Sequence, residues 1–342
     1  MRERIWLTWE RQRRNRTVSV ALDAELYELH YPLPRLRRWT AAISGTLRIL
    51  WRERPQVVFA QNPSLILALL AAWYGRLCGR ITVIDAHNAG VYPFFERKSW
   101  HARLLRPLMQ RLVHHVMRTA DLTLVSNASL QAYVESVGGR AFVLPDPLPR
   151  FPGFARPASV EGDGCRVLFI CTWAADEPYL EVIAAAVRLD PGIQVLITGN
   201  SKGREQAYGQ PLPPNVTLTG YLPEDEFVHL LHAVDVVMDL TILQDCLVCG
   251  AYEAVAAGTP LILSDTRALR EYFRRGVVFT ANRAEAIAAA IERALAERQR
   301  LAAEIAALKL ELEDGWQRQR EQLEAWIGAQ AARVVTAADR KL

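Results

Sequence analysis

The chain has 342 residues, of which 51% are hydrophobic and 23% charged, and its formal net charge is +4. This length exceeds one ordinary hydrophobic core and predicts two domains, and the composition excludes collagen-like, disordered and disulfide-stapled chains. The charge is divided unevenly, because residues 1–150 carry 22 Lys and Arg against 11 Asp and Glu while the remainder carries 19 against 26.

Strand-like and helix-like segments alternate through the first half of the chain. Short apolar runs predict strands at Ile5–Thr8, Glu25–His30, Gln56–Gln61, Ile81–Ala86, Leu122–Ser126 and Ala141–Leu144. Helical spacing predicts helices at Arg37–Arg52, Ser64–Leu77, Ala102–Arg118 and Leu130–Val137. This alternation predicts a parallel sheet with helices on both faces, an N-terminal Rossmann-like domain over residues 1–150.

No segment predicts a membrane span. The longest apolar run, Leu65–Tyr74, is far shorter than the ~20 residues that a spanning helix needs. Charges follow the short apolar run Ile5–Trp9 at once, so we expect no signal peptide.

Proline and glycine interrupt the pattern after residue 150, and residues 151–164 are predicted to form a linker. The alternation then resumes over residues 165–297 as a second Rossmann-like domain. Its strands are predicted at Val167–Ile170, Gln194–Thr198, Val216–Leu218, Val234–Asp239, Leu261–Ser264 and Val277–Phe279. Its helices are predicted at Tyr179–Leu189, Glu224–His232, Ala251–Ala257, Ala268–Phe273 and Ala284–Ala296. A helical segment closes the chain at 298–342. In doubly wound sheets ligands bind beyond the carboxyl ends of the strands, so we expect the two domains to face a cleft.

The strongest motif runs from Asp245 to Glu253, between a strand and a helix. The N-terminus of a helix offers free backbone N–H groups and a positive dipole end, which suit a phosphate or pyrophosphate. Glu253 is placed to accept hydrogen bonds from ribose hydroxyls. The scattered cysteines are typical of reduced thiols in the cytoplasm, and Cys246 and Cys249 have no second pair that would complete a metal site.

This passage resembles the retaining GT-B glycosyltransferases, especially family 4 of the sugar-nucleotide transferases. Their hallmark is Glu, seven residues, Glu, then an Ala-rich helix and Gly-x-Pro; here Asp245, seven residues, Glu253 and then Gly258-Thr-Pro260 follow. The resemblance covers most of residues 165–297. It implies a nucleoside-diphosphate sugar as co-substrate and no other cofactor or metal, with Glu253 on the ribose and Asp245 as a catalytic residue on the donor sugar.

The sequence departs from this family in two places. Asp245 stands where the family has Glu, and Cys171–Pro178 has no basic residue where the family has a Gly-Arg loop that grips the diphosphate. Phosphate charge is then expected to meet backbone amides around Gly250, together with Lys202 or Arg267. The predicted donor-binding residues are Gly250, Ala251, Tyr252, Glu253, Thr198, Gly199, Asn200, Lys202 and Arg267.

The first domain supplies candidate residues for the acceptor. His87 and Asn88 follow a buried strand, and the resemblance implies that His87 lies beside the sugar as a catalytic residue; a structural role is the alternative. Clustered guanidiniums can bind phosphate in bidentate fashion. The predicted acceptor-binding and phosphate-binding residues are Glu10, Arg11, Arg13, Arg14 and Asn88, with a solvated helix face as the alternative for the arginines.

The basic first half indicates an anionic partner. Trp100–Arg118 sets Leu, Met and Val at helical spacing among Arg and His, a pattern typical of a helix that lies on an anionic bilayer; a core-facing stripe with a wet basic back is the alternative. Nucleic acid is not expected, because no nucleic-acid-binding module accompanies the basic residues. We therefore expect a cytoplasmic protein, peripheral at the inner membrane face.

These expectations combine into a glycosyltransferase. It moves a sugar from its nucleotide donor to a lipid-linked or phosphate-bearing saccharide, with retention, in the synthesis of surface polysaccharides or glycoconjugates. The alternatives are a degenerate GT-B protein that serves as a non-catalytic binding subunit, and a sugar-nucleotide epimerase of the same two-domain plan.

Overall fold

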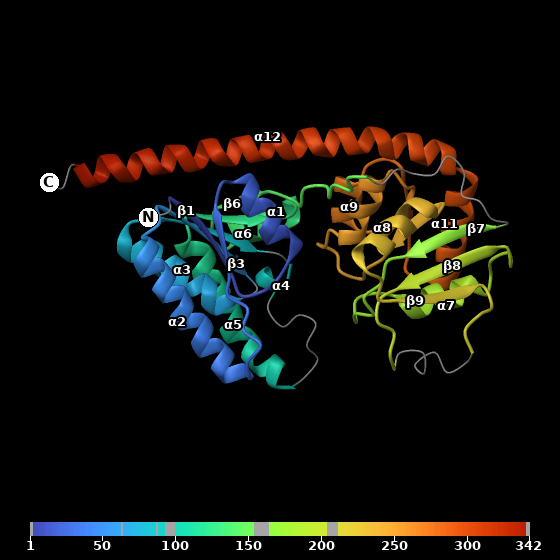
Figure 1. The fold of residues 1–342 in the computed structure, drawn as a ribbon, viewed down its shortest axis with the longest axis horizontal. Helices are drawn as coiled ribbons and strands as arrows, with labels where there is room; N and C mark the ends of the chain where they lie inside the picture. The colour runs from blue at the N-terminus through green and yellow to red at the C-terminus, as the bar shows by residue number, and fades with distance from the viewer. Residues whose placement is uncertain are drawn as a thin grey trace. The chain divides into compact units, whose positions relative to one another are not determined.

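The computed structural model describes residues 3–62, 64–86, 88–92, 100–153, 164–203 and 211–339. It divides into two compact units, of which unit 1 comprises Met1–Pro147 with Gly315–Leu342, and unit 2 comprises Leu148–Asp314. Each unit contains one parallel six-stranded sheet with flanking helices (Figure 1). The prediction of two doubly wound α/β domains is confirmed.

The sheet of unit 1 has the strand order β2-β1-β3-β4-β5-β6. Its strands are β1 (Arg4–Thr8), β2 (Glu25–Glu28), β3 (Val57–Asn62), β4 (Ile81–Ala86), β5 (Leu122–Val125) and β6 (Ala141–Val143). Its helices are α1 (Arg13–Ala21), α2 (Arg35–Glu53), α3 (Leu65–Cys78), α4 (Asn88–Val91), α5 (Trp100–Thr119) and α6 (Ala128–Ser136). β3 and β4 are buried along their whole length, which explains their continuous apolar sequences.

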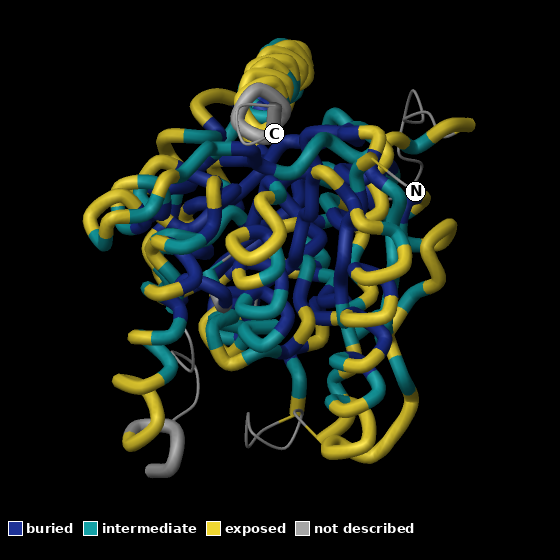
Figure 2. Tube along the Cα trace, turned by 90° about the vertical axis from the view of Figure 1, so that its left-hand side faces the viewer, coloured by how far each residue is buried: buried dark blue, intermediate teal, exposed yellow. Residues whose placement is uncertain are grey.

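Two apolar layers cover the sheet of unit 1. On one face α2, α3 and α5 pack against β1, β3 and β4, with Ile49, Ala68 and Val113 among the buried side chains. On the other face α1 packs together with the last part of the C-terminal helix, which buries Leu323 and Ile327 against Trp6 and Phe59. In Figure 2 the buried positions (dark blue) lie inside and the exposed positions (yellow) gather on loops and outer helical turns.

The sheet of unit 2 has the order β12-β11-β10-β7-β8-β9. Its strands are β7 (Cys165–Phe169), β8 (Ile193–Thr198), β9 (Val216–Gly220), β10 (Val236–Asp239), β11 (Leu261–Ser264) and β12 (Val277–Thr280). Its helices are α7 (Tyr179–Ala186), α8 (Glu224–Ala233), α9 (Cys249–Ala257), α10 (Arg267–Tyr272) and α11 (Ala284–Ala296). The central strands β7 and β10 pair with each other, so the loops that follow them emerge side by side at one edge of the sheet.

The C-terminal helix α12 (Arg298–Asp339) belongs to both units. Its first part buries Ile305 and Leu308 in unit 2, where Lys309 Nζ donates to the carbonyl of Ala256 at 2.8 Å. From Gly315 onward it packs on unit 1, where Trp316 Nε1 donates to Pro145 O at 3.0 Å. The separate segment predicted at 298–342 is therefore one helix shared between two units. Most of the predicted linker, residues 154–163, lies outside the described residues.

Candidate active site

The first turn of α9 lies directly against the carboxyl end of β10. A Cβ built on Gly250 would stand 2.6 Å from Asp239 Oδ2 and 2.6 Å from Ile170 Cδ1, so a larger residue at this position would force its neighbours to move. α9 begins at Cys249, two residues before the predicted start, and Val248 makes no side-chain cap. The motif thus places a helix N-terminus at the edge of the sheet where the sequence predicts a phosphate site.

Asp239 is a buried carboxylate beneath this helix. It is 6% exposed, and the backbone N–H of Gly250 donates to it. Burial, followed by the negative charges of Glu177 and Glu253, raises the pKa of Asp239 well above its ordinary value of 3.8. Asp176 adds to the same effect. Among the described residues, no His, Cys, Asp or Glu group has an arrangement that could hold a metal ion.

The loop between β10 and α9 is held by hydrogen bonds and carries Asp245. Thr241 Oγ1 donates to Asp176 Oδ2 at 2.9 Å, and the backbone N–H of Thr241 donates to Ser264 Oγ at 3.0 Å. Asp245 is half-buried in a turn, and its charge helps to raise the pKa of Arg267 after the larger contributions of Glu271. Arg267 also forms an exposed ion pair with Glu271 at 2.7 Å. Two predicted donor-site residues, Asp245 and Arg267, therefore lie within electrostatic reach of each other.

The residues predicted at the end of β8 divide into two kinds. Thr198 and Gly199 support the neighbouring loop, because Cys171 N–H donates to Thr198 Oγ1 at 2.9 Å and a Cβ on Gly199 would stand 2.1 Å from Cys171 O. Asn200 and Lys202 are exposed, and the N–H of Lys202 donates to Asn200 Oδ1 at 3.3 Å. The first two residues shape the site, whereas Asn200 and Lys202 have side chains open to solvent.

Glu177 fills an anion-binding turn in the loop after β7. Its carboxylate accepts the N–H of Thr172 at 2.9 Å, the N–H of Ala174 at 2.8 Å and the Thr172 hydroxyl at 2.9 Å. Between them Trp173 has a φ of 63°, and a residue in this left-handed conformation turns neighbouring N–H groups toward one anion. The sequence showed that this loop lacks a basic residue but did not reveal that Glu177 occupies it. The one available signal was the carboxylate pair Asp176–Glu177 just before α7.

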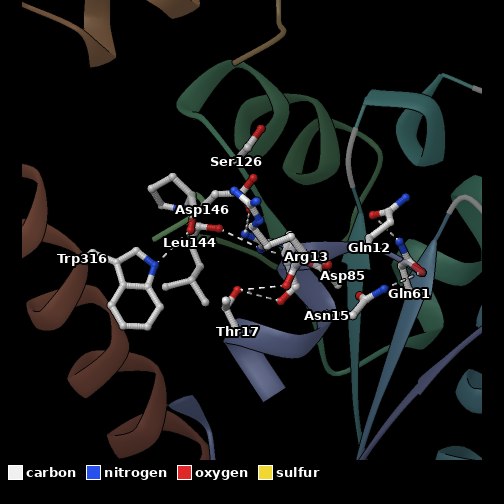
Figure 3. Close-up of polar contacts among 12 residues, drawn as sticks. Gln12, Arg13, Asn15, Thr17, Gln61, Asp85, Ser126, Leu144, Asp146 and Trp316 are labelled. Carbon is white, nitrogen blue, oxygen red and sulfur yellow. Dashed lines mark hydrogen bonds and ion pairs between the residues drawn. The ribbon is translucent and has the colours of Figure 1, made fainter. Parts of the chain in front are cut away.

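Unit 1 has a buried ion-pair cluster at the carboxyl ends of its strands (Figure 3). Arg14 Nη2 lies 2.7 Å from Asp85 Oδ1 and 2.9 Å from the carbonyl of Leu144, and Arg14 Nη1 lies 2.6 Å from Asp146 Oδ1. Burial lowers the pKa of Arg14, but the charges of Asp85 and Asp146 and their hydrogen bonds outweigh it, so the pKa lies above its ordinary value. Arg14 is 6% exposed. Arg14 therefore joins β4, the end of β6 and α1. The sequence predicted that Arg14 binds an acceptor phosphate, but its guanidinium is buried in these ion pairs and is not open to one.

A polar network beside this cluster fixes the loop after β1. Asn15 Nδ2 donates to Gln61 Oε1 at 3.0 Å, and Gln61 Nε2 donates to Gln12 Oε1 at 2.6 Å (Figure 3). Trp6 Nε1 donates to Asn15 Oδ1 at 3.0 Å, and the Thr8 hydroxyl contacts Gln61. These contacts hold the start of α1 in position.

The other residues predicted for the acceptor lie around this network. Arg11 and Arg13 are exposed, and Glu10 is half-buried and accepts from Gln12 Nε2 at 2.9 Å. Asn88 begins α4, and its Oδ1 is buried without a hydrogen-bond partner among the described residues. His87 lies outside the described residues. Asn88, which the sequence predicts to bind the acceptor substrate, thus has a buried side-chain oxygen to which a ligand could donate a hydrogen bond.

The comparisons agree with this division of the chain. Residues 167–308, which lie within unit 2, match the family model described as glycosyl transferases group 1. This match contains α9, Asp245, Glu253 and the loop after β7. No curated protein matches the chain.

Solved structures extend the likeness to both units. Sucrose-phosphate synthase from Thermosynechococcus elongatus is 19% identical, with a TM-score of 0.68 over 92% of this chain and 84% of that one. HepE of Anabaena in complex with UDP and glucose is 12% identical, with a TM-score of 0.71 over 96% of this chain and 100% of that one. A putative UDP-N-acetylglucosamine 2-epimerase from Listeria monocytogenes is 13% identical, with a TM-score of 0.53 over 86% and 79%. At such identities these likenesses establish the shared GT-B fold.

Proposed function

We propose that the protein is a glycosyltransferase that binds a nucleoside-diphosphate sugar in unit 2 and transfers the sugar to an acceptor bound by unit 1. The observation that carries this proposal is the seating of α9 on the end of β10 through Gly250, within the domain that matches the group 1 family. The solved structure of HepE, which has a similar fold, contains UDP and glucose. This supports a nucleotide sugar as the donor.

The donor contacts follow from the motif. Glu253 accepts hydrogen bonds from the ribose, Asp245 contacts the donor sugar, and the diphosphate lies at the N-terminus of α9. The helix supplies the free N–H groups of its first turn and its dipole. Arg267 and Lys202, both exposed, provide positive charge beside it. In this proposal transfer needs no essential metal, because amides and basic side chains stabilise the departing diphosphate.

The chemistry of the transfer needs few protein groups. An acceptor hydroxyl attacks the anomeric carbon while the bond between that carbon and the diphosphate oxygen breaks, and the hydroxyl proton leaves with the diphosphate. Because positioning and charge stabilisation carry the reaction, the site needs no pair of carboxylates at glycosidase spacing. We propose retention of the anomeric configuration, with His87 and Asn88 beside the donor sugar.

The acceptor is proposed to be a lipid-linked or phosphate-bearing saccharide of surface polysaccharide or glycoconjugate synthesis. The excess of Lys and Arg in residues 1–150 supports an anionic acceptor and an anionic lipid surface, with Glu10, Arg11 and Arg13 near the end of β1. None of the described helices is long and apolar enough to cross a bilayer. In this proposal the protein acts peripherally at the cytoplasmic face of the inner membrane, where the excess of Lys and Arg in residues 1–150 meets anionic lipid.

The loop after β7 favours a second candidate, a degenerate transferase that binds without catalysing. The carboxylate of Glu177 occupies the N–H groups of Thr172 and Ala174, so that loop does not offer them to a donor phosphate. Glu253 adds negative charge nearby. A donor diphosphate must then rely on α9 and on Arg267 or Lys202. A sugar-nucleotide epimerase is a further enzymatic alternative, because the solved structure of a putative UDP-N-acetylglucosamine 2-epimerase has a similar fold.

A thermal-shift panel of UDP-, GDP- and dTDP-sugars tests the donor proposal, because a ligand that binds only the folded state raises its Tm. We expect one nucleotide to raise the Tm of the wild type, and no rise with any of them would overturn the proposal. Product analysis then separates the candidates. A transferase releases its nucleoside diphosphate only with an acceptor, an epimerase alters the sugar nucleotide alone, and a binding subunit does neither.

A further inference from the structure

Three neighbouring helices of unit 1 expose large apolar side chains. On α2, Leu47 is 49% exposed and Trp51 73%; on α3, Trp73 is 50% and Leu77 84% exposed. On α5, Leu104 is 71% and Leu108 50% exposed. Single exposed leucines are ordinary, but six such side chains on three adjacent helices indicate an interaction surface. We call these six residues and the arginines between them the α2–α3–α5 face.

The six residues lie on the outer side of one layer. α2 contacts α3 and α3 contacts α5, and all three helices bury their opposite sides in the same apolar core over the sheet (Figure 1). Leu47 and Trp51 are one helical turn apart, as are Trp73 and Leu77, and Leu104 and Leu108. Trp73 Nε1 also donates to His115 Nε2 of α5 at 3.3 Å. Each of the six apolar side chains is exposed on the side of its helix that faces away from the core.

The same layer carries almost only positive charge. α2 has five arginines and one glutamate, Glu53, which pairs with Arg52 at 2.7 Å. α3 has one arginine, and α5 has four arginines and no acidic residue. Arg37 and Arg48 are exposed on α2, and Arg111 is exposed on α5. A partner of this face must therefore accept apolar side chains and supply negative charge.

We propose that the α2–α3–α5 face docks on the surface of an anionic lipid bilayer. Tryptophan and leucine partition into the boundary between head groups and acyl chains, and arginine pairs with anionic head groups while its stem lies along apolar surface. A second copy of the chain that paired through the same face would bring like charges together, and nucleic acid offers no apolar region for exposed leucines. The helices lie in the plane of the membrane surface, with no segment across it.

The biological purpose of this docking rests on the proposed function, since a lipid surface would bring unit 1 to a lipid-linked acceptor. The test of docking itself requires no measurement of transferase activity. The full chain is floated with vesicles of phosphatidylcholine alone and with vesicles that also contain phosphatidylglycerol. The paired variant Trp51→Ser with Trp73→Ser is compared with the control Val20→Ser with Leu310→Ser, whose residues are 80% and 65% exposed elsewhere. A third variant, Arg37→Glu with Arg48→Glu, tests the charge.

The proposal predicts that the wild type and the control float with phosphatidylglycerol vesicles and that added salt releases them. The tryptophan and arginine variants should lose at least about tenfold in the bound fraction, with unchanged circular dichroism, because each loses buried apolar area or head-group attraction. Equal flotation of all variants, or no flotation of the wild type, overturns it. So does a wild-type dimer in size-exclusion chromatography that the tryptophan substitutions convert to monomer.

The failure of this inference is distinguishable from the failure of the proposed function. If the wild type binds a sugar nucleotide but no vesicle, only the docking proposal fails. If it binds vesicles through the α2–α3–α5 face but none of the sugar nucleotides raises its Tm, only the proposed function fails.

Discussion

The Cα of Gly250 lies so close to the buried carboxylate of Asp239 that a Cβ at position 250 would stand 2.6 Å from Asp239 Oδ2. This approach lets the first turn of α9 donate an N–H group to the end of β10. It ties the helix that carries Glu253 to the strand edge at which the donor is proposed to bind. The position of α9 against the end of β10 therefore depends on the absence of a side chain at Gly250.

The substitution Gly250→Ala should disrupt this contact. The added methyl group would also stand 2.6 Å from Ile170 Cδ1, so α9 or these buried side chains must shift, at an expected cost of about 1–3 kcal/mol in the free energy of unfolding. Urea unfolding measures the cost, and the affinity for the donor should fall with it. Gly315→Ala is the matched control, since the nearest atom lies 4.0 Å from its Cβ and alanine favours a helix. Equal stabilities of the two variants would contradict this account.

Asp239→Asn should change how stability depends on pH. The pKa of Asp239 is raised in the folded state by burial and by Glu177 and Glu253, so folding is penalised once the carboxyl group ionises. The wild type should therefore lose stability as the pH rises from 3.8 through the folded-state pKa, and the variant should lose less. Urea unfolding of both proteins from pH 4 to pH 8 measures this. Parallel profiles would show that Asp239 carries no such penalty.

Arg14 and Arg16 offer a direct comparison of buried and exposed ion pairs on one helix. Arg14→Ala leaves Asp85 buried without its partner and should cost about 3–5 kcal/mol of unfolding free energy. Arg16→Ala removes an exposed pair with Glu28 and should cost about 0–1 kcal/mol. Denaturant unfolding followed by circular dichroism measures both. Similar costs for the two variants would mean that Arg14 does not hold unit 1 together as described.

The strands were predictable because their chemistry is local. Each predicted strand overlaps one of the twelve strands within two residues, since central strands such as β3 and β4 are buried on both faces and have continuous apolar sequences. α1 was not among the predicted helices, because its first four residues, three arginines and one asparagine, show no apolar spacing; a solvated helix face was only the alternative for the arginines. α12 was predicted as a helix, but its amphipathic pattern does not tell which unit its apolar side covers.

The site was only partly predictable because its partners are far apart in sequence. Arg14 meets Asp85 and Asp146, which lie 71 and 132 residues further along the chain, so its burial could not be inferred from the cluster of arginines around it. Glu177 meets Thr172 and Ala174 through a turn that depends on the left-handed Trp173. Tryptophan rarely adopts a left-handed conformation, and the residues around Trp173 give no sequence signal for one. The Asp245–Glu253 motif was predictable because its residues lie within one loop and one helix.

Calorimetric titration of UDP into the wild type and into Glu253→Ala tests the central claim most directly. The control is Glu292→Ala, an exposed helical glutamate of the same unit. We predict that the wild type and the control bind UDP equally. Glu253→Ala should bind at least about tenfold more weakly, as expected when hydrogen bonds to a charged group worth about 1.5–3 kcal/mol are lost. Equal affinity of Glu253→Ala and the wild type, or no binding of UDP, GDP or dTDP by the wild type, would contradict the proposed donor site.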